Sequence, residues 1–296
     1  MNLLWAVFTL IAAASQTARN AMQRELTGSL GALGSTHVRF LFGAPFALLF
    51  LFGAMLATGD GLPHPGIRFW LWILLGASTQ ILSTALMLMT MLERSVVVTI
   101  AYLKTEPIQV AMLGLFFLGE ALTLPAIVAI VTATLGVMLI SFKPAGMKSG
   151  VRPALLGLAA AAGFALSSVG YRGAITSLSV HHFLMAASFS LAVGLVMQSL
   201  LLGAYLAWRD RIVLRAILRL WRPSLFAGFM GAAASEFWFL AFALATAASV
   251  RTLALVEVLF AQATSHFLFK QKTTMREIVG IVFVVAGCAL LVWTQS

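Results

Sequence analysis

Long apolar runs, separated by short polar, proline or glycine breaks, follow one another through the whole chain. The hydrocarbon core of a bilayer is about 30 Å thick and needs roughly 20 apolar residues per helical span, and the runs recur at about that interval. The pattern predicts an all-α membrane protein with ten transmembrane helices. Their expected positions are residues 3–20, 31–55, 67–90, 96–118, 124–142, 153–175, 183–208, 223–245, 250–269 and 275–293.

The composition also indicates a membrane protein. Of the 296 residues, 61% are hydrophobic and 9% are charged, which leaves too little polar surface to coat a soluble globule of this size. The first apolar run begins at Leu3 with no basic residue before it, so we interpret it as a retained helix and not as a signal peptide. The single cysteine, Cys288, lies inside the last apolar run. We expect no disulfide, no metal site and no cofactor.

Basic residues are distributed unevenly between the connections. The formal net charge is +10, an excess that a membrane protein carries mainly on its cytoplasmic loops. The odd-numbered connections hold 14 lysines and arginines, whereas the even-numbered ones hold only Arg68, Arg172 and Arg251. We therefore predict that the odd connections face the cytoplasm, that both termini are periplasmic, and that nucleic acid is not a partner.

The connection between the seventh and eighth spans has a helical pattern of its own. Arg211, Arg215 and Arg219 recur at helical spacing, while Val213 and Ile217 mark the opposite face. This pattern predicts a short amphipathic helix that lies on the anionic inner leaflet of the bilayer. An orienting anchor is the simpler interpretation, and a regulatory lipid site is the alternative.

The two halves of the sequence resemble each other. Offsets of 151 and 153 residues bring together Glu106 with Glu257, Gly136 with Gly287, and Arg19 with Arg172. We predict two related units of five spans each, residues 1–147 and 148–296. Because five is odd, the second unit enters the bilayer the other way up. Inverted repeats of this kind are common in secondary transporters, which hold the substrate near the midplane between the repeats.

Short motifs in the first half resemble a known transporter family. Glu106-Pro107 inside the fourth span and Leu118-Gly119-Glu120 after it resemble the end of an EamA repeat in the drug/metabolite transporter superfamily. Arg39 looks like this family's arginine near the start of the second span. The second half keeps Glu257, but Val258 replaces the proline and Phe269-Lys270-Gln271 replaces Leu-Gly-Glu.

In length and in the acids of its fourth and ninth spans, the chain is similar to the YddG-type amino-acid exporters of that superfamily. The resemblance implies export of amino acids, above all aromatic or apolar ones, and of related small metabolites or organic cations. It implies a place in the inner membrane of a bacterial cell. We expect the protein to work as a monomer.

Glu106 and Glu257 mark the expected substrate site. A carboxylate at the bilayer centre costs several kcal/mol, so two at equivalent depths suggest a shared function. Tyr102, Glu106 and Gln109 are spaced to share one helix face. Pro107 lacks an amide hydrogen and is expected to kink the helix, freeing a carbonyl beside the carboxylate. The alternative is a protonated, packed acid beside an ordinary kink.

Lys104 leaves three interpretations open: it snorkels, it pairs with Glu257 or Glu236, or it receives a substrate carboxylate. Glu236 lies centrally in the eighth span, two residues before Trp238. Three acids near one lysine are costly to keep ionised together, so at least one is expected to hold a proton.

Polar stripes on other spans complete the expected site. Gln80 and Ser83 share a face of the third span, and Gln16 belongs to a similar stripe on the first. Such stripes either line a water-filled path or join helices by hydrogen bonds, and together we interpret them as a cavity wall. Ser168 and Tyr171 on the sixth span are weaker candidates.

We predict a transporter and not an enzyme. The five histidines form no His-Glu-x-x-His cluster, and Asp60 has no partner aspartate in a span, which argues against an intramembrane protease. A channel and a lipid-carrier flippase on the same scaffold stay open. The favoured hypothesis is alternating access: the ammonium group of an amino acid binds Glu106 or Glu257, its carboxylate meets Lys104, and its side chain rests near Trp238.

Overall fold

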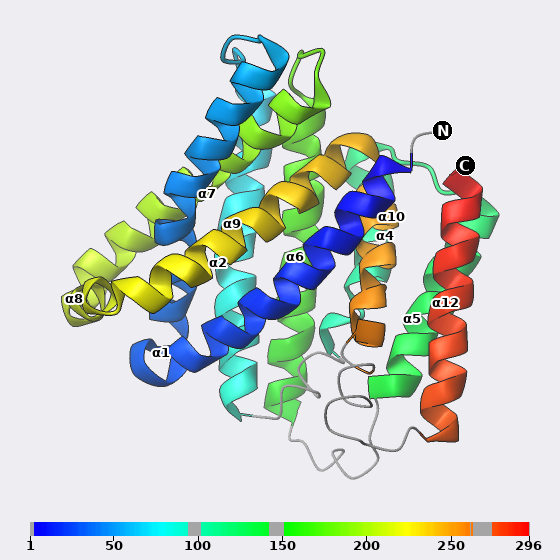
Figure 1. Ribbon diagram of the computed structural model, residues 1–296. Helices are drawn as coiled ribbons and strands as arrows, with labels where there is room; N and C mark the ends of the chain where they lie inside the picture. Colours follow the sequence, from blue (N-terminus) through cyan, green and yellow to red (C-terminus); the bar gives the residue numbers. More distant parts are fainter. Residues whose placement is uncertain (1–2, 94–101, 142–150, 261, 263–273, 296) are drawn as a thin grey trace.

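The computed structural model describes residues 3–93, 102–141, 151–260, 262 and 274–295, and it confirms the all-α class for them (Figure 1). The helices are α1 (Leu4–Thr58), α2 (Ile67–Glu93), α4 (Glu106–Leu118), α5 (Leu124–Ser141), α6 (Val151–Thr176), α7 (Phe183–Arg209), α8 (Arg211–Arg219), α9 (Trp221–Leu244), α10 (Ala247–Leu253), the 3₁₀-helix η2 (Ala254–Val256) and α12 (Met275–Gln295).

Seven helices among the described residues are long and apolar enough to cross a bilayer: Glu25–Thr58, Ile67–Met91, Leu124–Ser141, Leu155–Thr176, Phe183–Arg209, Trp221–Leu244 and Met275–Thr294. Leu4–Thr17 and Glu106–Leu118 are apolar but shorter. The predicted fourth and ninth spans run in part through 94–101 and 263–273, which lie outside the described residues. The chain is thus a multi-pass membrane protein, and the count of ten spans stays a prediction.

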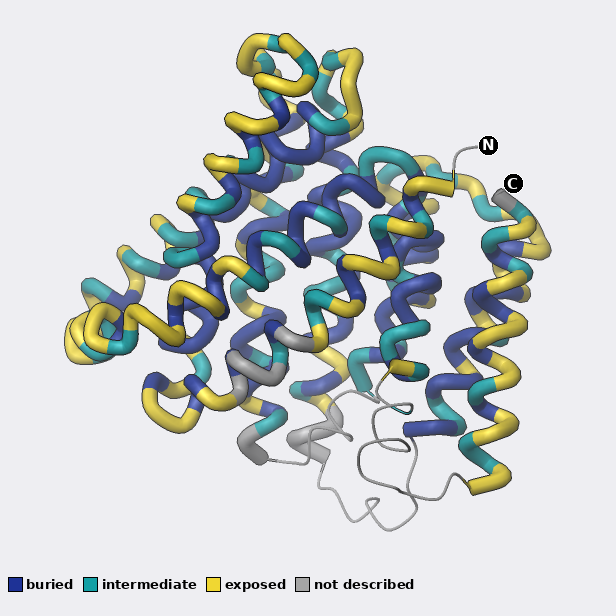
Figure 2. Tube along the Cα trace, in the orientation of Figure 1, coloured by how far each residue is buried: buried dark blue, intermediate teal, exposed yellow. Residues whose placement is uncertain are grey.

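Burial separates an outer from an inner surface of the bundle. The outward faces of the helices are exposed and the inward faces are buried (Figure 2). Many of the exposed side chains are large and apolar, and Phe116 is 81% exposed. Acyl chains would cover such a surface, because lipid is as apolar as the side chains themselves.

The first two predicted spans form one helical run with a break at Gly31. We expected a connection over residues 21–30, but α1 continues to Leu30 because Leu26 and Leu30 pack against Ile217 of α8. Gly31 has φ 68° and ψ 176°, a conformation that only glycine adopts at low cost. The helix is kinked at this residue, and Figure 1 shows that α1 changes direction along its length.

Both predicted acidic spans are broken just before their acid. Lys104 and Thr105 form a turn, and α4 begins at Glu106. In the second half, η2 interrupts the helix immediately before Glu257. The 151-residue offset places these two breaks at the same point. Pro107 therefore lies in the first turn of α4, where a missing amide hydrogen costs little. We had expected it to kink the interior of a helix, whereas here the helix begins just before it.

Three pairs of helices form the most extensive contacts: α1 with α9, α2 with α6, and α5 with α12. The α5–α12 contact depends on glycine. A Cβ at Gly136 would lie 2.6 Å from the backbone nitrogen of Val284 and 2.7 Å from the carbonyl oxygen of Gly280. Gly287 is equally close to the backbones of Ala133 and Ala129, which correspond to Val284 and Gly280 at the 151-residue offset.

The predicted amphipathic helix is present as α8. The Asp210 side chain caps it by accepting hydrogen bonds from the amides of Ile212 and Val213, each at 3.2 Å. Ile217 is fully buried, while Arg211 and Arg215 are exposed. The helix therefore has one face on the bundle and a basic face directed away from it.

Candidate functional site

A cavity of about 310 Å³ lies among α1, α2, α6, α9 and α10 and the residues around the two helix breaks. Residues of both halves of the chain line it. Six of them are ionisable and basic or acidic: Arg19, Arg39, Lys104, Glu106, Arg251 and Glu257. Because an unpaired buried charge is costly, the pairing of these two acids with the four bases determines which charges remain uncompensated.

Glu106 is paired with Arg251 of α10. Arg251 donates from Nε to Oε1 at 2.6 Å and from Nη2 to Oε2 at 2.5 Å, which is the bidentate geometry of a strong ion pair. The two side chains are only 8% and 13% exposed. Ser168 of α6 donates a further hydrogen bond to Oε1 at 3.3 Å. Three donors thus hold the Glu106 carboxylate.

Glu257 is paired with Lys104, which is one of the three interpretations left open for that lysine. The other carboxylate oxygen accepts from Nε2 of Gln16 at 3.3 Å. Gln16 in turn accepts from the indole nitrogen of Trp238 at 3.1 Å. The ring of Trp238 also lies against the guanidinium of Arg251, 4.8 Å from its centroid. Trp238 therefore connects the two ion pairs, one by a hydrogen bond and the other by a cation–π contact.

Each ion pair joins one half of the chain to the other. Glu106 comes from the first half and Arg251 from the second, while Glu257 comes from the second and Lys104 from the first. The acids correspond at the 151-residue offset, but the cations do not, since Leu255 stands at the position matching Lys104. Both pairs thus join a glutamate to a basic residue, but only the glutamates occupy corresponding positions in the two halves.

Arg19 and Arg39 also line the cavity, and both are buried, 4% and 2% exposed. Arg39 donates to Thr84 at 3.5 Å and to Ser235 at 3.4 Å, and its Nε has no hydrogen-bond partner among the described residues. Arg19 donates to the side-chain oxygen of Asn20 at 2.8 Å. Neither arginine forms a salt bridge with a carboxylate of the described chain.

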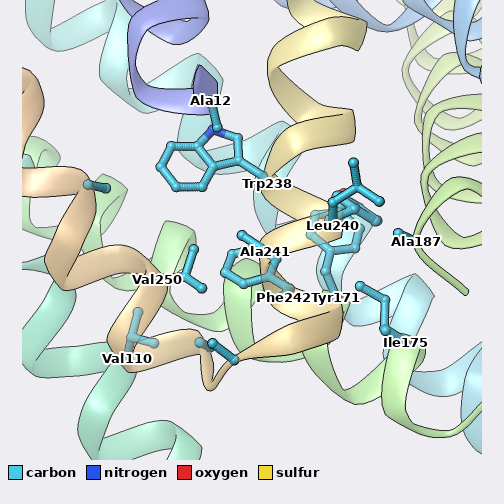
Figure 3. Packing of buried hydrophobic residues seen from close by; sticks show 14 of the residues in the cluster. Ala12, Val110, Tyr171, Ile175, Ala187, Trp238, Leu240, Ala241, Phe242 and Val250 are labelled. Atoms are coloured by element: carbon cyan, nitrogen blue, oxygen red, sulfur yellow. The ribbon is translucent and has the colours of Figure 1, made fainter. Parts of the chain in front are cut away.

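Aromatic side chains form the apolar part of the wall. Trp238, Phe239 and Phe242 come from α9, and Figure 3 shows the Trp238 ring beside Ala12 of α1. Tyr171 of α6 packs against Phe239 with the ring centroids 4.6 Å apart. Its hydroxyl donates to Gln80 at 2.8 Å, so the phenol is fixed in the wall. The cavity therefore combines a charged side with an aromatic one.

Comparison with known proteins identifies the scaffold. The sequence profile of the EamA-like transporter family matches residues 3–142 and again residues 151–293. The chain belongs to the EamA-like transporter family. It is therefore a membrane transporter with the drug/metabolite transporter fold, as the motifs around Glu106 and Glu120 suggested.

A solved structure agrees with this assignment at the level of the fold. It is described only as the crystal structure of a protein; the TM-score is 0.68 at 14% sequence identity, with 99% of this chain and 98% of that chain covered. No curated protein matches the sequence. The family match gives the transporter class and does not specify the substrate.

Six of the ten residues predicted for the substrate site line the cavity of this EamA-like transporter: Gln16, Gln80, Lys104, Glu106, Trp238 and Glu257. The other four lie elsewhere. Glu236 accepts from Ser188 of α7 at 2.5 Å, and its other oxygen is buried without a partner among the described residues. Ser83 packs against Gly163. Tyr102 packs against Gly157, and Gln109 donates to Thr105 at 3.1 Å.

Arg251 was missed by the sequence reasoning, which counted it as a basic residue of a loop. It lies within α10, and the same is true of Arg172, which lies within α6 and binds Glu120 at 2.9 Å. The available signal was their place: both were exceptions to the distribution of basic residues between the connections. A basic residue in a connection predicted to face the periplasm, where few are expected, is a candidate member of a buried ion pair.

The Leu-Gly-Glu motif of the EamA repeat has a structural role outside the cavity. α4 ends at Leu118 because Gly119 adopts φ 66°. Glu120 then turns back to Arg172, which also donates to the carbonyl of Phe242. The motif thus joins the end of α4 to α6 and α9.

Within the described residues, no group of three His, Cys, Asp or Glu side chains is arranged to hold a metal ion.

Proposed function

We propose that this EamA-like transporter exports small amphiphilic metabolites, foremost amino acids with aromatic or apolar side chains, across the bacterial inner membrane by alternating access. One observation carries the proposal: a cavity lined by residues of both halves of the chain is bordered by two ion pairs, each of which joins one half to the other. Bonds that cross between the halves are the ones that a relative movement would break and remake.

The cavity has the size and lining that such a substrate needs. About 310 Å³ is at the lower end of the range for small-molecule pockets and suits a solute of amino-acid size. The aromatic wall of Trp238, Phe239 and Phe242 would receive an apolar side chain, and the basic side chains would receive a carboxylate. The ammonium role that we expected for Glu106 and Glu257 is weakened, because both carboxylates already have cationic partners.

The proposed movement is a rocking of two inverted repeats. The Gly136 and Gly287 contacts, which correspond at the 151-residue offset, support related halves that face opposite ways. The breaks before Glu106 and Glu257 provide points at which a helix bends without losing many hydrogen bonds. Each acid would then move with the helix segment that it begins, opening or closing its ion pair.

The test uses the purified full-length protein in vesicles loaded with radiolabelled L-phenylalanine. We expect saturable efflux that Glu106→Gln and Glu257→Gln lower at least tenfold, because each substitution breaks one pair between the halves. Glu236→Gln is the matched control, since it changes a buried acid that does not line the cavity, and it should keep the parental rate. Equal rates for all four proteins would refute the site, and efflux that does not saturate would indicate a channel.

A lipid-carrier flippase is the second candidate, because four basic side chains against two acids give the cavity an excess of positive charge that suits a phosphate headgroup. The same vesicles distinguish it. A lipid-carrier flippase would move a fluorescent polyprenyl phosphate between leaflets and would not release a water-soluble amino acid.

A further inference from the structure

The charges around the cavity do not balance. Among its four cations and two acids, Arg251 is used by Glu106 and Lys104 is used by Glu257. Arg19 and Arg39 remain, and neither has a carboxylate partner in the described parts of the chain. Two positive charges are therefore buried in the wall without a counter-charge among the residues that the structure describes. A buried charge left uncompensated costs several kcal/mol, so a ligand that compensates it is strongly favoured.

The hydrogen bonds of these two arginines are also incomplete. A guanidinium has five N–H donors and accepts nothing. Arg39 makes contacts of 3.5 and 3.4 Å to two hydroxyl groups, which is at the long limit, and its buried Nε is unsatisfied in the described structure. Among the described side chains, Arg19 donates to one oxygen, that of the neighbouring Asn20. Both side chains thus have donors in reserve beside a cavity.

The side chains of Arg19 and Arg39 both pack against the same glycine, Gly231 of α9. Arg19 comes from the part of α1 before Gly31 and Arg39 from the part after it. A Cβ at Gly231 of α9 would lie 3.2 Å from Cγ of Arg39 and 3.5 Å from Cδ of Arg19. Their charges repel each other and that of Arg251. Packing against Gly231 keeps these like charges close together, so an anion that binds between them would reduce their repulsion.

A comparison within the chain shows that this charge is specific to one half. Arg172, which matches Arg19 at the 153-residue offset, is neutralised by Glu120 at 2.9 Å. The residue that matches Glu120 at the 151-residue offset is Gln271, which carries no charge. Arg172 thus has a carboxylate partner from the first half, whereas the corresponding position of the second half offers Arg19 no carboxylate.

We infer that Arg19 and Arg39 form an oxyanion-recognition site, so that the transported solute must carry a carboxylate or a similar oxyanion and need not carry a positive charge. The inference rests on the proposed function, since it names the substrate class of the same cavity. Guanidinium groups bind planar carboxylates in bidentate fashion, and Trp238 and Phe239 on the same wall receive the apolar body. An amino acid would bind through its carboxylate, and its ammonium group would add little.

The experiment measures binding separately from transport. Four probes share one aromatic ring: L-phenylalanine, N-acetyl-L-phenylalanine, phenethylamine and phenyl phosphate. Calorimetry on the detergent-purified full-length protein should show that both carboxylates bind and that the amine binds at least tenfold more weakly. Phenyl phosphate tests whether the site also accepts a phosphate. Equal binding of the amine, or no binding of either carboxylate at 10 mM, would overturn the inference.

Variants connect the binding to the two arginines. Arg19→Gln and Arg39→Gln should each weaken binding of N-acetyl-L-phenylalanine at least tenfold, whereas Arg19→Lys, which keeps the charge, should recover part of the loss. Arg68→Gln removes an exposed arginine and should bind like the parent protein. If both Gln variants are monodisperse and bind like the parent, the site is wrong. Carboxylate binding without efflux would leave the site in place and refute the proposed transport instead.

Discussion

Arg251 and Glu106 form a pair whose members depend on each other. Both are nearly buried, and two short N–H···O bonds join them. In so dry a place the energy of the pair matters less than the cost of an unpaired member, which is commonly about 3–5 kcal/mol. Glu106 would keep only the 3.3 Å bond from Ser168 if Arg251 were removed. The pair therefore stabilises this part of the cavity wall mainly by preventing an isolated charge.

We expect Arg251→Gln to destabilise the protein by about 3 kcal/mol or more and the double variant Glu106→Gln/Arg251→Gln by clearly less than the sum of the two single changes. The reason is that the double variant leaves no buried charge without a partner. Thermal unfolding of the detergent-purified proteins measures it, with Glu106→Gln as the other single variant. Additive effects would show that the two side chains do not interact in the folded protein.

At this scale the sequence indicated some residues clearly and others not at all. Glu106 and Glu257 were identifiable because a carboxylate in an apolar run has few explanations. Glu236 gave the same signal, yet it faces Ser188 on α7, and the helix face it occupies depends on how neighbouring helices pack. Arg251 lay at a predicted span boundary and looked like a loop residue. Polarity in the sequence thus shows that a partner is needed but not which one.

At the scale of helices, close backbone approach decides the packing of α5 against α12. Gly136 and Gly287 occupy matching places in the two halves, and a Cβ at either would lie about 2.6 Å from a partner backbone atom. In a membrane, helices associate by van der Waals packing and weak hydrogen bonds because lipid removes the hydrophobic driving force. Small residues at the contact are therefore the main determinant of this pair.

We expect Gly136→Ala and Gly287→Ala to destabilise the protein by similar amounts, about 1–3 kcal/mol each, because a methyl group in either place forces the helices apart. Gly53→Ala in α1 is the control: nothing lies within 4 Å of a Cβ there, and alanine should be neutral or stabilising. Melting temperatures of the three variants provide the comparison. Unequal losses at Gly136 and Gly287 would contradict the correspondence of the two halves.

Helix positions followed from the sequence wherever an apolar run had polar ends. The predicted spans at 67–90, 124–142 and 183–208 agree closely with α2, α5 and α7. The prediction was wrong where tertiary contacts override local signals. α1 runs through residues 21–30 because that segment packs on α8, and the break before Glu257 contains neither glycine nor proline. Those features depend on neighbours that a periodicity count does not include.

On the scale of the whole molecule, the acids repeat between the halves and the cations do not. Glu106 and Glu257 correspond, whereas Lys104, Arg251, Arg19 and Arg39 have no basic residue at matching positions, apart from Arg172 for Arg19. The two halves of the chain thus differ in charge around the cavity, and the positive excess comes from Arg19 and Arg39 of the first half. Such a distribution orients a substrate that has one anionic end and one apolar end.

A different asymmetry, the uneven distribution of basic residues between the connections, predicts the orientation in the membrane. The first and last helices have their chain ends at one end of the bundle, and α8, which carries the exposed arginines, is separated from the connection between α1 and α2 (Figure 1). If the basic connections face the cytoplasm, cysteines at these two places should differ in access. We expect an impermeant thiol reagent added to intact cells to label Gly61→Cys and not Arg215→Cys, in a background where Cys288 is replaced by serine. Permeabilised cells, in which both cysteines should react, provide the control. Labelling of Arg215→Cys from outside would reverse the assigned orientation, and the direction of transport would then have to be reversed with it.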